Sequence, residues 1–276
     1  MSDRSETKLL LSDVDGTILT DAEELTPASV AAVGDLRERG KLFTLVSGRP
    51  PRGMQMLVEP LGLEIPMAGF NGGTIVNPDM SVLHQRDVPD AQVSEIFSII
   101  DRFGLAPWAY SGPDWFVLDA DTDHVRKHQS AVKFPPTVVS SFDGVDGFAK
   151  IVGVSNDFDA VLQAETATRE ALADHVSVSR SKPYYLDVTH PDANKGAMAD
   201  YLSQRLDLDL GELASIGDMP NDVLMFARTG YGIAMGNADP EVQRSARYVT
   251  TSNNSDGFAN AVQRFVLRRS IRPESP

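Results

Sequence analysis

Short apolar runs alternate with helix-like segments at both ends of this chain, and this alternation constrains the fold most. Residues 8–12 (KLLLS) form a run typical of a buried strand that ends at a turn. A helix is predicted to begin at Thr26 and Pro27 and to end at Gly40, and residues 42–46 (LFTLV) form the next strand. Strand, helix and strand in this order indicate a right-handed parallel unit, so the sequence predicts an α/β fold.

The alternation is interrupted in the middle of the chain. Beyond a boundary near Ser81, residues 82–187 contain strand-like pieces (WFVLD, FAKIVGVS and YYLDVT) and helical pieces that do not alternate strictly. Alternation resumes with a helix predicted over residues 196–206. A length of 276 residues suits one core with a sizeable insertion. We therefore expect residues 1–81 and 188–276 to form the core, and 82–187 an inserted α+β domain.

Composition excludes several classes of function. The chain has no cysteine, so disulfides, zinc–thiolate sites and cysteine nucleophiles are ruled out, and any metal must bind oxygen or imidazole. Its net charge of -14 opposes binding to nucleic acids and anionic membranes. Neither a membrane helix nor a signal peptide is predicted, so we expect a cytoplasmic protein. An acidic protein that binds a small phosphate ester needs a local cation, lysine or helix N-terminus.

Polar residues follow three of the predicted strands. Asp13 and Asp15 come after the first strand, Ser47 after the second, and Asp218 after the run LASIG. Open parallel sheets bind ligands at the carboxyl ends of their strands. Neighbouring ionised carboxylates repel each other unless a cation compensates, and Asp222 adds another carboxylate. An all-oxygen site of this kind suits Mg²⁺.

Each of these segments also has a purely structural interpretation. DVDGT (residues 13–17) contains an Asp-Gly pair, which is common in turns. Asp218 and Asp222 are suited to cap the following helix. Lys195 precedes a predicted helix and, taken alone, is most simply a solvated lysine.

Taken together and in order, the segments resemble a known family. DVDGT, Ser47, Lys195 with Gly196, and GDMPND (residues 217–222) are similar to the four motifs of the haloacid dehalogenase superfamily phosphatases. FNGG (residues 70–73) and AMGNA (residues 234–238) resemble the Cof-like branch, which has large α+β caps of the C2 type. The resemblance implies a Rossmann-like parallel-sheet core, with the insert as its cap.

The resemblance also implies roles for individual residues. Asp13 would be the nucleophile that forms an aspartyl-phosphate, and Asp15 would transfer the proton. Mg²⁺ would be held by the Asp13 carboxylate, the Asp15 carbonyl and Asp218. The phosphate ligands would be Ser47, Gly48, Lys195 and Asn221. Asp222 would orient Lys195 or the waters of the metal.

The substrate implied is a small phosphorylated metabolite such as a sugar phosphate. Candidate specificity residues in the insert are Trp108, Trp115, Tyr184, Tyr185, Lys150 and Lys182. Packing is the alternative role for the aromatic residues. His124 and His128 share a helical spacing, and we expect them on a solvated face without a metal. A phosphomutase, or a regulatory protein that accepts phosphate without hydrolysing it, remains an alternative function.

Overall fold

The computed structural model describes residues 6–172 and 174–267, which form two compact units. The first unit contains the described chain up to Val46, the segment Glu59–Ile65, and the described chain from Lys195 to Leu267. The second unit contains Ser47–Val58 and Pro66–Asn194. Residues 47–58 and 66–81 thus lie with the second unit, whereas the sequence placed them in the core. The expected domain boundaries at 81/82 and 187/188 stay a prediction.

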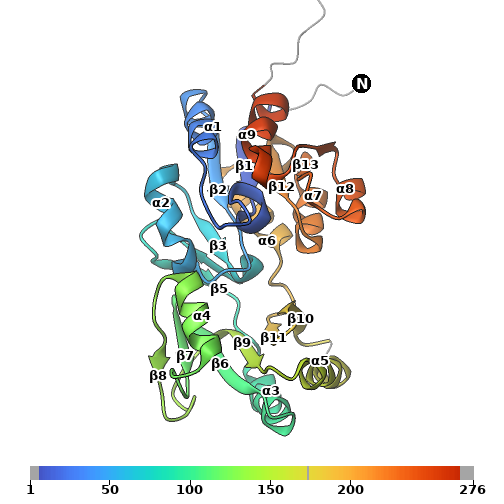
Figure 1. Ribbon diagram of the computed structural model, residues 1–276. Coiled ribbons are helices and arrows are strands. Elements are labelled where there is room, and N and C mark those ends of the chain that lie inside the picture. Colours follow the sequence, from blue (N-terminus) through green and yellow to red (C-terminus); the bar gives the residue numbers. More distant parts are fainter. Residues whose placement is uncertain (1–5, 173, 268–276) are drawn as a thin grey trace, which may run out of the picture. The chain divides into compact units, whose positions relative to one another are not determined.

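The first unit is built on a five-stranded sheet in which all the paired strands are parallel (Figure 1). In spatial order its strands are β14 (Tyr248–Val249), β13 (Tyr231–Ala234), β12 (Leu213–Gly217), β1 (Leu9–Ser12) and β2 (Leu42–Leu45). β1, β12 and most of β2 are buried, as their continuous apolar runs predict. The predicted α/β class is confirmed.

Helices precede or follow the strands of this sheet along the chain. They are α1 (Pro27–Glu38), α6 (Lys195–Leu206), α7 (Val223–Arg228), α8 (Pro240–Ser245) and α9 (Gly257–Ala261). The predicted start of α1 is correct, because the Thr26 side chain accepts a hydrogen bond from the Ser29 N–H and Pro27 is the first helical residue. A further short helix, α2 (Gln55–Leu61), has residues in both units.

The strand order places a ligand-binding edge beside β1. From β1 the chain passes to β2 on one side, whereas β12, β13 and β14 extend the sheet on the other side. Such a reversal between β1 and β12 marks the position where open parallel sheets bind ligands, at the carboxyl ends of the strands. Ser12 pairs with Ile216 in the register, so the residues that follow β1 and β12 emerge next to each other.

The second unit contains two sheets. The larger one is antiparallel except for the pair β7 and β8. In spatial order its strands are β10 (Ser177–Lys182), β11 (Tyr185–Thr189), β9 (Phe148–Val154), β6 (Ala106–Ser111), β7 (Asp114–Val117) and β8 (Thr137–Val138). The smaller, antiparallel sheet contains β3 (Met67–Gly69), β4 (Thr74–Val76) and β5 (Val82–Gln85).

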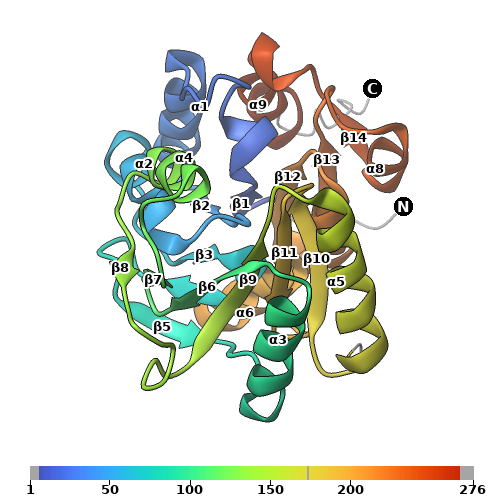
Figure 2. The ribbon, with the colours of Figure 1, turned by 60° about the horizontal axis from the view of Figure 1, so that its bottom comes forward.

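Helices cover both faces of the larger sheet. On one face, α3 (Asp90–Arg102) and α5 (Phe158–Leu172) pack on a cluster that includes Ala109 and Ile151 (Figure 2). On the other face, α4 (Asp123–Val132) packs on a cluster that includes Trp108 and Val152. The two clusters use alternate residues of the same strands, because successive side chains of a strand point to opposite faces.

No helix among residues 6–172 and 174–267 combines the length and apolar character needed to cross a membrane.

Candidate active site

The turn after β1 brings Asp13 into a buried position and leaves Asp15 exposed. The Asp13 N–H donates to the Ile216 carbonyl at 2.9 Å, which continues the pairing of β1 with β12. Gly16 follows with a φ of 72°, a conformation that favours glycine. A Cβ atom at Gly16 would lie 2.3 Å from Oδ2 of Asp218, so this glycine also makes room for that carboxylate.

Lys195 joins two carboxylates from different parts of the first unit. It is the first residue of α6 and its side chain is buried. Its Nζ atom donates to Oδ1 of Asp13 at 2.6 Å and to Oδ1 of Asp222 at 2.7 Å. The alternative of a solvated lysine is therefore wrong. Burial lowers the pKa of Lys195, but the charges of Asp13 and Asp222 outweigh that effect and raise it above its usual value, so the ammonium group stays protonated.

Asp222 binds Lys195 and also holds the backbone of the turn after β12. Its Oδ2 atom accepts hydrogen bonds from the backbone N–H groups of Asp218 at 2.9 Å and Met219 at 2.8 Å. A Cβ atom at Gly217 would lie 2.3 Å from the Asp222 carboxyl carbon, so the last residue of β12 must be small. The capping role considered for Asp222 is thus partly correct: it binds backbone N–H groups of the turn and, at the same time, the lysine.

Asp218 is also buried, and both of its carboxylate oxygens accept hydrogen bonds. Oδ1 accepts from the Thr17 hydroxyl at 3.1 Å, and Oδ2 accepts from Nδ2 of Asn237 at 3.3 Å. From the sequence, Thr17 was expected only as a residue of the DVDGT turn and Asn237 only as part of AMGNA, and neither was expected to contact Asp218. Asn237 lies three residues beyond the end of β13, so the rule that ligands gather at strand ends would have indicated it.

The three buried aspartates lie close enough to hold one cation. Asp13, Asp218 and Asp222 each place a carboxylate oxygen within 4.8 Å of the others. If all three carboxylates are ionised, they carry three negative charges, and the Lys195 ammonium group balances one of them. Two negative charges of the cluster then remain unbalanced. An oxygen donor set with this charge fits Mg²⁺. We expected Asp15 to take part through its backbone carbonyl, and that contribution stays a prediction.

Burial, together with the excess of negative charge, raises pKa values in this cluster. Burial raises the pKa of Asp13 well above its usual value; Lys195 opposes this shift, and the charges of Asp222 and Asp218 add to it. Burial and the charge of Asp222 raise the pKa of Asp218 to about 6. A divalent cation would lower both values, because it favours the ionised carboxylates.

The remaining predicted phosphate ligands lie in different units. Asn221 is an exposed residue in the turn after β12, in the first unit. Ser47 and Gly48 follow β2 and belong to the second unit. There the Ser47 N–H donates to the Ala68 carbonyl at 3.0 Å, and its hydroxyl accepts from the Arg49 N–H at 3.1 Å. The roles of all three residues stay predictions.

In the second unit, the expectation of a solvated face for His128 is wrong. Its Nε2 atom lies 2.7 Å from the Tyr110 hydroxyl, and its ring lies 4.8 Å from that of Trp115. Burial lowers the pKa of His128 to about 4, and the charge of Lys150 acts in the same direction. Trp108 and Trp115 are buried in this cluster, so the alternative of a packing role holds for both.

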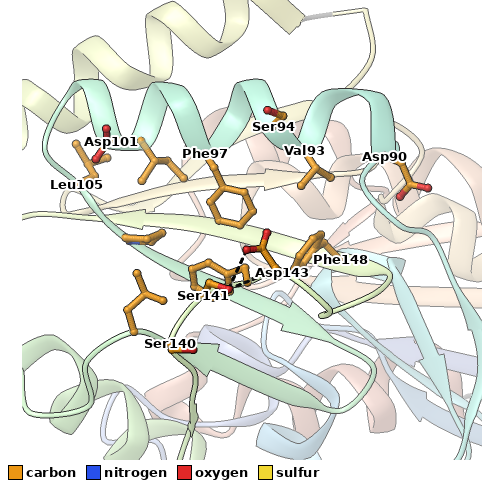
Figure 3. A pocket seen from close by; sticks show the side chains of 14 residues that line it. Asp90, Val93, Ser94, Phe97, Asp101, Leu105, Ser140, Ser141, Asp143 and Phe148 are labelled. Carbon is orange, nitrogen blue, oxygen red and sulfur yellow. Dashed lines mark hydrogen bonds between the residues drawn. The ribbon is translucent and has the colours of Figure 1, made fainter.

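The second unit also contains a cavity of about 640 Å³ beside α3 (Figure 3). Aromatic rings of Phe97, Phe142 and Phe148 line it, and Phe97 stacks on Phe142 at 5.0 Å. Asp143 at its edge accepts a hydrogen bond from Ser141. None of the predicted site residues is among those that line this cavity.

Known proteins resemble the chain along nearly all of its length. Residues 10–262 match the family described as haloacid dehalogenase-like hydrolase. A putative phosphatase of Haemophilus influenzae is 27% identical over 254 residues, which are 91% of this chain and 95% of that protein. A 5-amino-6-(5-phospho-D-ribitylamino)uracil phosphatase of Bacillus subtilis is 24% identical, over 94% of this chain and 96% of its own.

A solved structure agrees with the fold. The crystal structure of a haloacid dehalogenase-like hydrolase from Bacteroides thetaiotaomicron superposes with a TM-score of 0.86 at 26% identity. The match covers 94% of this chain and 99% of that one. The similarity therefore includes the residues of both units.

Proposed function

Because the chain belongs to the haloacid dehalogenase-like hydrolases, we propose that it hydrolyses small phosphate monoesters with Asp13 as the nucleophile. One observation carries this proposal: the buried Asp13 carboxylate lies 2.6 Å from a buried lysine that a second aspartate holds in place. A carboxylate attacks without prior loss of a proton, and the lysine supplies positive charge where the anionic phosphoryl group arrives. The names of the relatives, which are phosphatases, point in the same direction.

The reaction proceeds in two displacements. An Asp13 carboxylate oxygen attacks phosphorus, the bond from phosphorus to the ester oxygen breaks, and Asp15 gives its proton to the leaving alkoxide. Water then attacks the phosphorus of the aspartyl-phosphate and gives a proton to Asp15, which releases inorganic phosphate and regenerates Asp13. The exposed position of Asp15 allows it to exchange protons with substrate and water.

The binding groups act through charge and position. Asp13, Asp218 and the Asp15 carbonyl would hold Mg²⁺, which supplies positive charge that lets the anionic nucleophile and phosphate approach each other. In the first unit, Lys195 and Asn221 bind the phosphoryl oxygens. The Ser47 hydroxyl and the Gly48 N–H of the second unit would have the same role, as the family resemblance implies. Asp222 keeps Lys195 oriented. We propose that residues 82–187 act as a cap that selects the organic part of a sugar phosphate or similar ester.

Phosphate release from a panel of small phosphate esters tests the proposal. We expect release by the wild type to require Mg²⁺ and to fall by roughly 10³-fold or more in Asp13→Asn, because this change removes the nucleophile and keeps the shape. The control is Asp101→Asn, which alters a carboxylate of the second unit in the cavity of Figure 3. It is expected to keep full activity on esters of simple alcohols.

Other outcomes would contradict the proposal. If phosphate moved to another position of a sugar and no free phosphate appeared, the protein would be a phosphomutase. A stable phosphoprotein without turnover would indicate a phospho-accepting regulatory protein. Full activity of Asp13→Asn would exclude Asp13 as the nucleophile.

A further inference from the structure

The side chain of Asn237 connects three loops of the first unit. Its Nδ2 atom donates to the Gly16 carbonyl at 2.9 Å and to Oδ2 of Asp218 at 3.3 Å. Its Oδ1 atom accepts from the Asn253 backbone N–H at 3.0 Å. One amide group therefore joins the loops that follow β1, β12 and β14.

The chemistry of the three partners fixes the direction of this amide. A backbone N–H only donates, so it must face the Asn237 oxygen, and the NH₂ group then points to the other two partners. A carbonyl and an ionised carboxylate only accept, so they need that NH₂ group. Aspartate at this position has no donor for them, and alanine has neither donor nor acceptor.

The partner of Asn237 is itself held in place. Asn253 is buried, and its Nδ2 atom donates to the Leu19 carbonyl at 3.1 Å and to Oδ1 of Asp21 at 2.9 Å. Asn254 donates to Oδ2 of Asp21 at 2.7 Å. The hydrogen bonds thus lead from Asp218 through Asn237 and Asn253 back to the chain segment that starts at Asp13.

Thr17 completes the arrangement around Asp218. Its hydroxyl binds Oδ1 while Asn237 binds Oδ2, so each carboxylate oxygen has a donor on this chain. Donors on both oxygens restrict rotation of the carboxylate about χ2. A carboxylate held in this way needs little reorientation to bind a cation, and partners of metal ligands typically change metal affinity through such contacts.

We propose that Asn237 is a positioning residue that orients Asp218 for a divalent cation and thereby sets the cation affinity of the site. The proposal deepens the proposed function and depends on Asp218 being a ligand of the cation. Asn237 is placed to act on cation binding and, by way of the Gly16 carbonyl, on the turn that carries Asp15.

Calorimetric titration of Mg²⁺ into the substrate-free protein tests the proposal without an activity readout. We expect Asn237→Ala to raise the Kd for Mg²⁺ by roughly tenfold or more, the usual effect of losing a partner of a metal ligand. At saturating Mg²⁺, the KM for a phosphate ester is expected to remain near that of the wild type. This split separates cation positioning from damage to the substrate site.

Gln243→Ala is the matched control. Gln243 lies on α8 and donates to the carbonyls of Gly236 at 3.2 Å and Ala238 at 2.9 Å, so it holds the same loop without a hydrogen bond to Asp218. Its Kd for Mg²⁺ is expected to stay close to that of the wild type. If Asn237→Ala does not fold, Asn237→Ser takes its place, because a serine side chain is too short to make all three hydrogen bonds.

Two results would overturn the inference, and neither of them would contradict the proposed function. An unchanged Kd in a folded Asn237 variant would show that the contact does not tune the site. An equal rise in Gln243→Ala would assign the effect to loop integrity. If the wild type bound no Mg²⁺ and released no phosphate, the proposed function would fail together with the inference.

Discussion

At the level of single residues, the site depends on carboxylates that pack directly against the backbone of two glycines. Gly16 and Gly217 leave room for the carboxylates of Asp218 and Asp222, and Lys195 lies between Asp13 and Asp222. The lack of a side chain at Gly16 and Gly217 therefore matters as much to the cation site as its charges do.

Gly16→Ala should therefore reduce phosphatase activity by far more than its loss of folding stability alone would explain. The positive φ costs about 1 kcal/mol or more for alanine, and the new methyl group would push the Asp218 carboxylate away. We expect a loss in kcat/KM on the order of 10²-fold, as displaced catalytic groups typically give.

Gly40→Ala is the control for this change. Gly40 has a φ of 68° and nothing within 4 Å of an added Cβ atom, so it bears the same backbone strain without the clash. Denaturant unfolding should show comparable destabilisation of both variants, while steady-state kinetics separate them. Equal activities would show that Asp218 tolerates displacement.

The sequence predicted the charged residues of the site better than their neutral partners. Asp13 and Asp218 directly follow apolar runs that end in turns, so local patterns indicated them. Lys195 was indicated only by its place in the series of motifs, because its local pattern alone favoured a solvated lysine. The contact between Asn237 and the Gly16 carbonyl joins residues 221 positions apart. The position of Asn237 after β13 indicates it as a site residue, but its partner on the Gly16 turn follows only from the tertiary arrangement of the loops.

At the level of elements, strands with apolar runs were predicted and strands with polar ones were missed. β9 (FAKIVGV) was predicted because most of its residues are apolar and buried. β10 (SVSRSK) was not predicted, because four of its six residues are exposed and it pairs with only one neighbouring strand. An edge strand of this kind has little apolar periodicity to detect.

Helix α4 carries a pH-sensitive contact with the sheet. His128 on this helix has a pKa of about 4 in the folded protein, against 6.5 as its ordinary value. Between these pH values the unfolded chain binds a proton that the folded protein does not, so stability decreases as the pH falls from about 6.5 to 4. The expected contribution is about 1.4 kcal/mol per pH unit, or roughly 3 kcal/mol in all.

His128→Phe should remove this contribution. Phenylalanine keeps an aromatic ring beside Trp108 and Trp115 and does not titrate. The unfolding free energy, followed by tryptophan fluorescence, should therefore depend less on pH in the variant than in the wild type over that window. Both tryptophans lie in the second unit, so the signal reports on it. Identical pH profiles would contradict the assignment.

At the level of the whole molecule, the charge balance opposes the proposed substrate. The chain carries a formal charge of -14, and a phosphate monoester is also an anion. Long-range repulsion slows their encounter, and salt screens it over about 10 Å at 0.1 M. The local cations of the site act only at short range.

Moderate salt should therefore increase kcat/KM for a phosphate ester. We expect a rise of roughly two- to threefold between low ionic strength and about 0.15 M KCl, with Mg²⁺ held at saturation. The kcat value at saturating substrate should change little, because it does not depend on encounter. A steady fall in kcat/KM with salt would show that attraction by the site dominates at long range.

The grouping of residues into the two compact units depends on packing, which composition does not reveal. Residues 47–58 and 66–81 contain ordinary strand and helix patterns, so nothing in their composition separates them from the core. Their assignment to the second unit follows from packing: Phe70, for example, places its ring 5.0 Å from that of Tyr110.

The pairing of β1 has a consequence for how the protein is made. β1 leaves the ribosome about two hundred residues before its neighbour β12, because Leu9 pairs with Leu213. The second unit is complete once Asn194 has emerged. Since units fold as they are synthesised, we expect the second unit to fold first on the nascent chain, and the carboxylates of the site to assemble only after β12 has emerged.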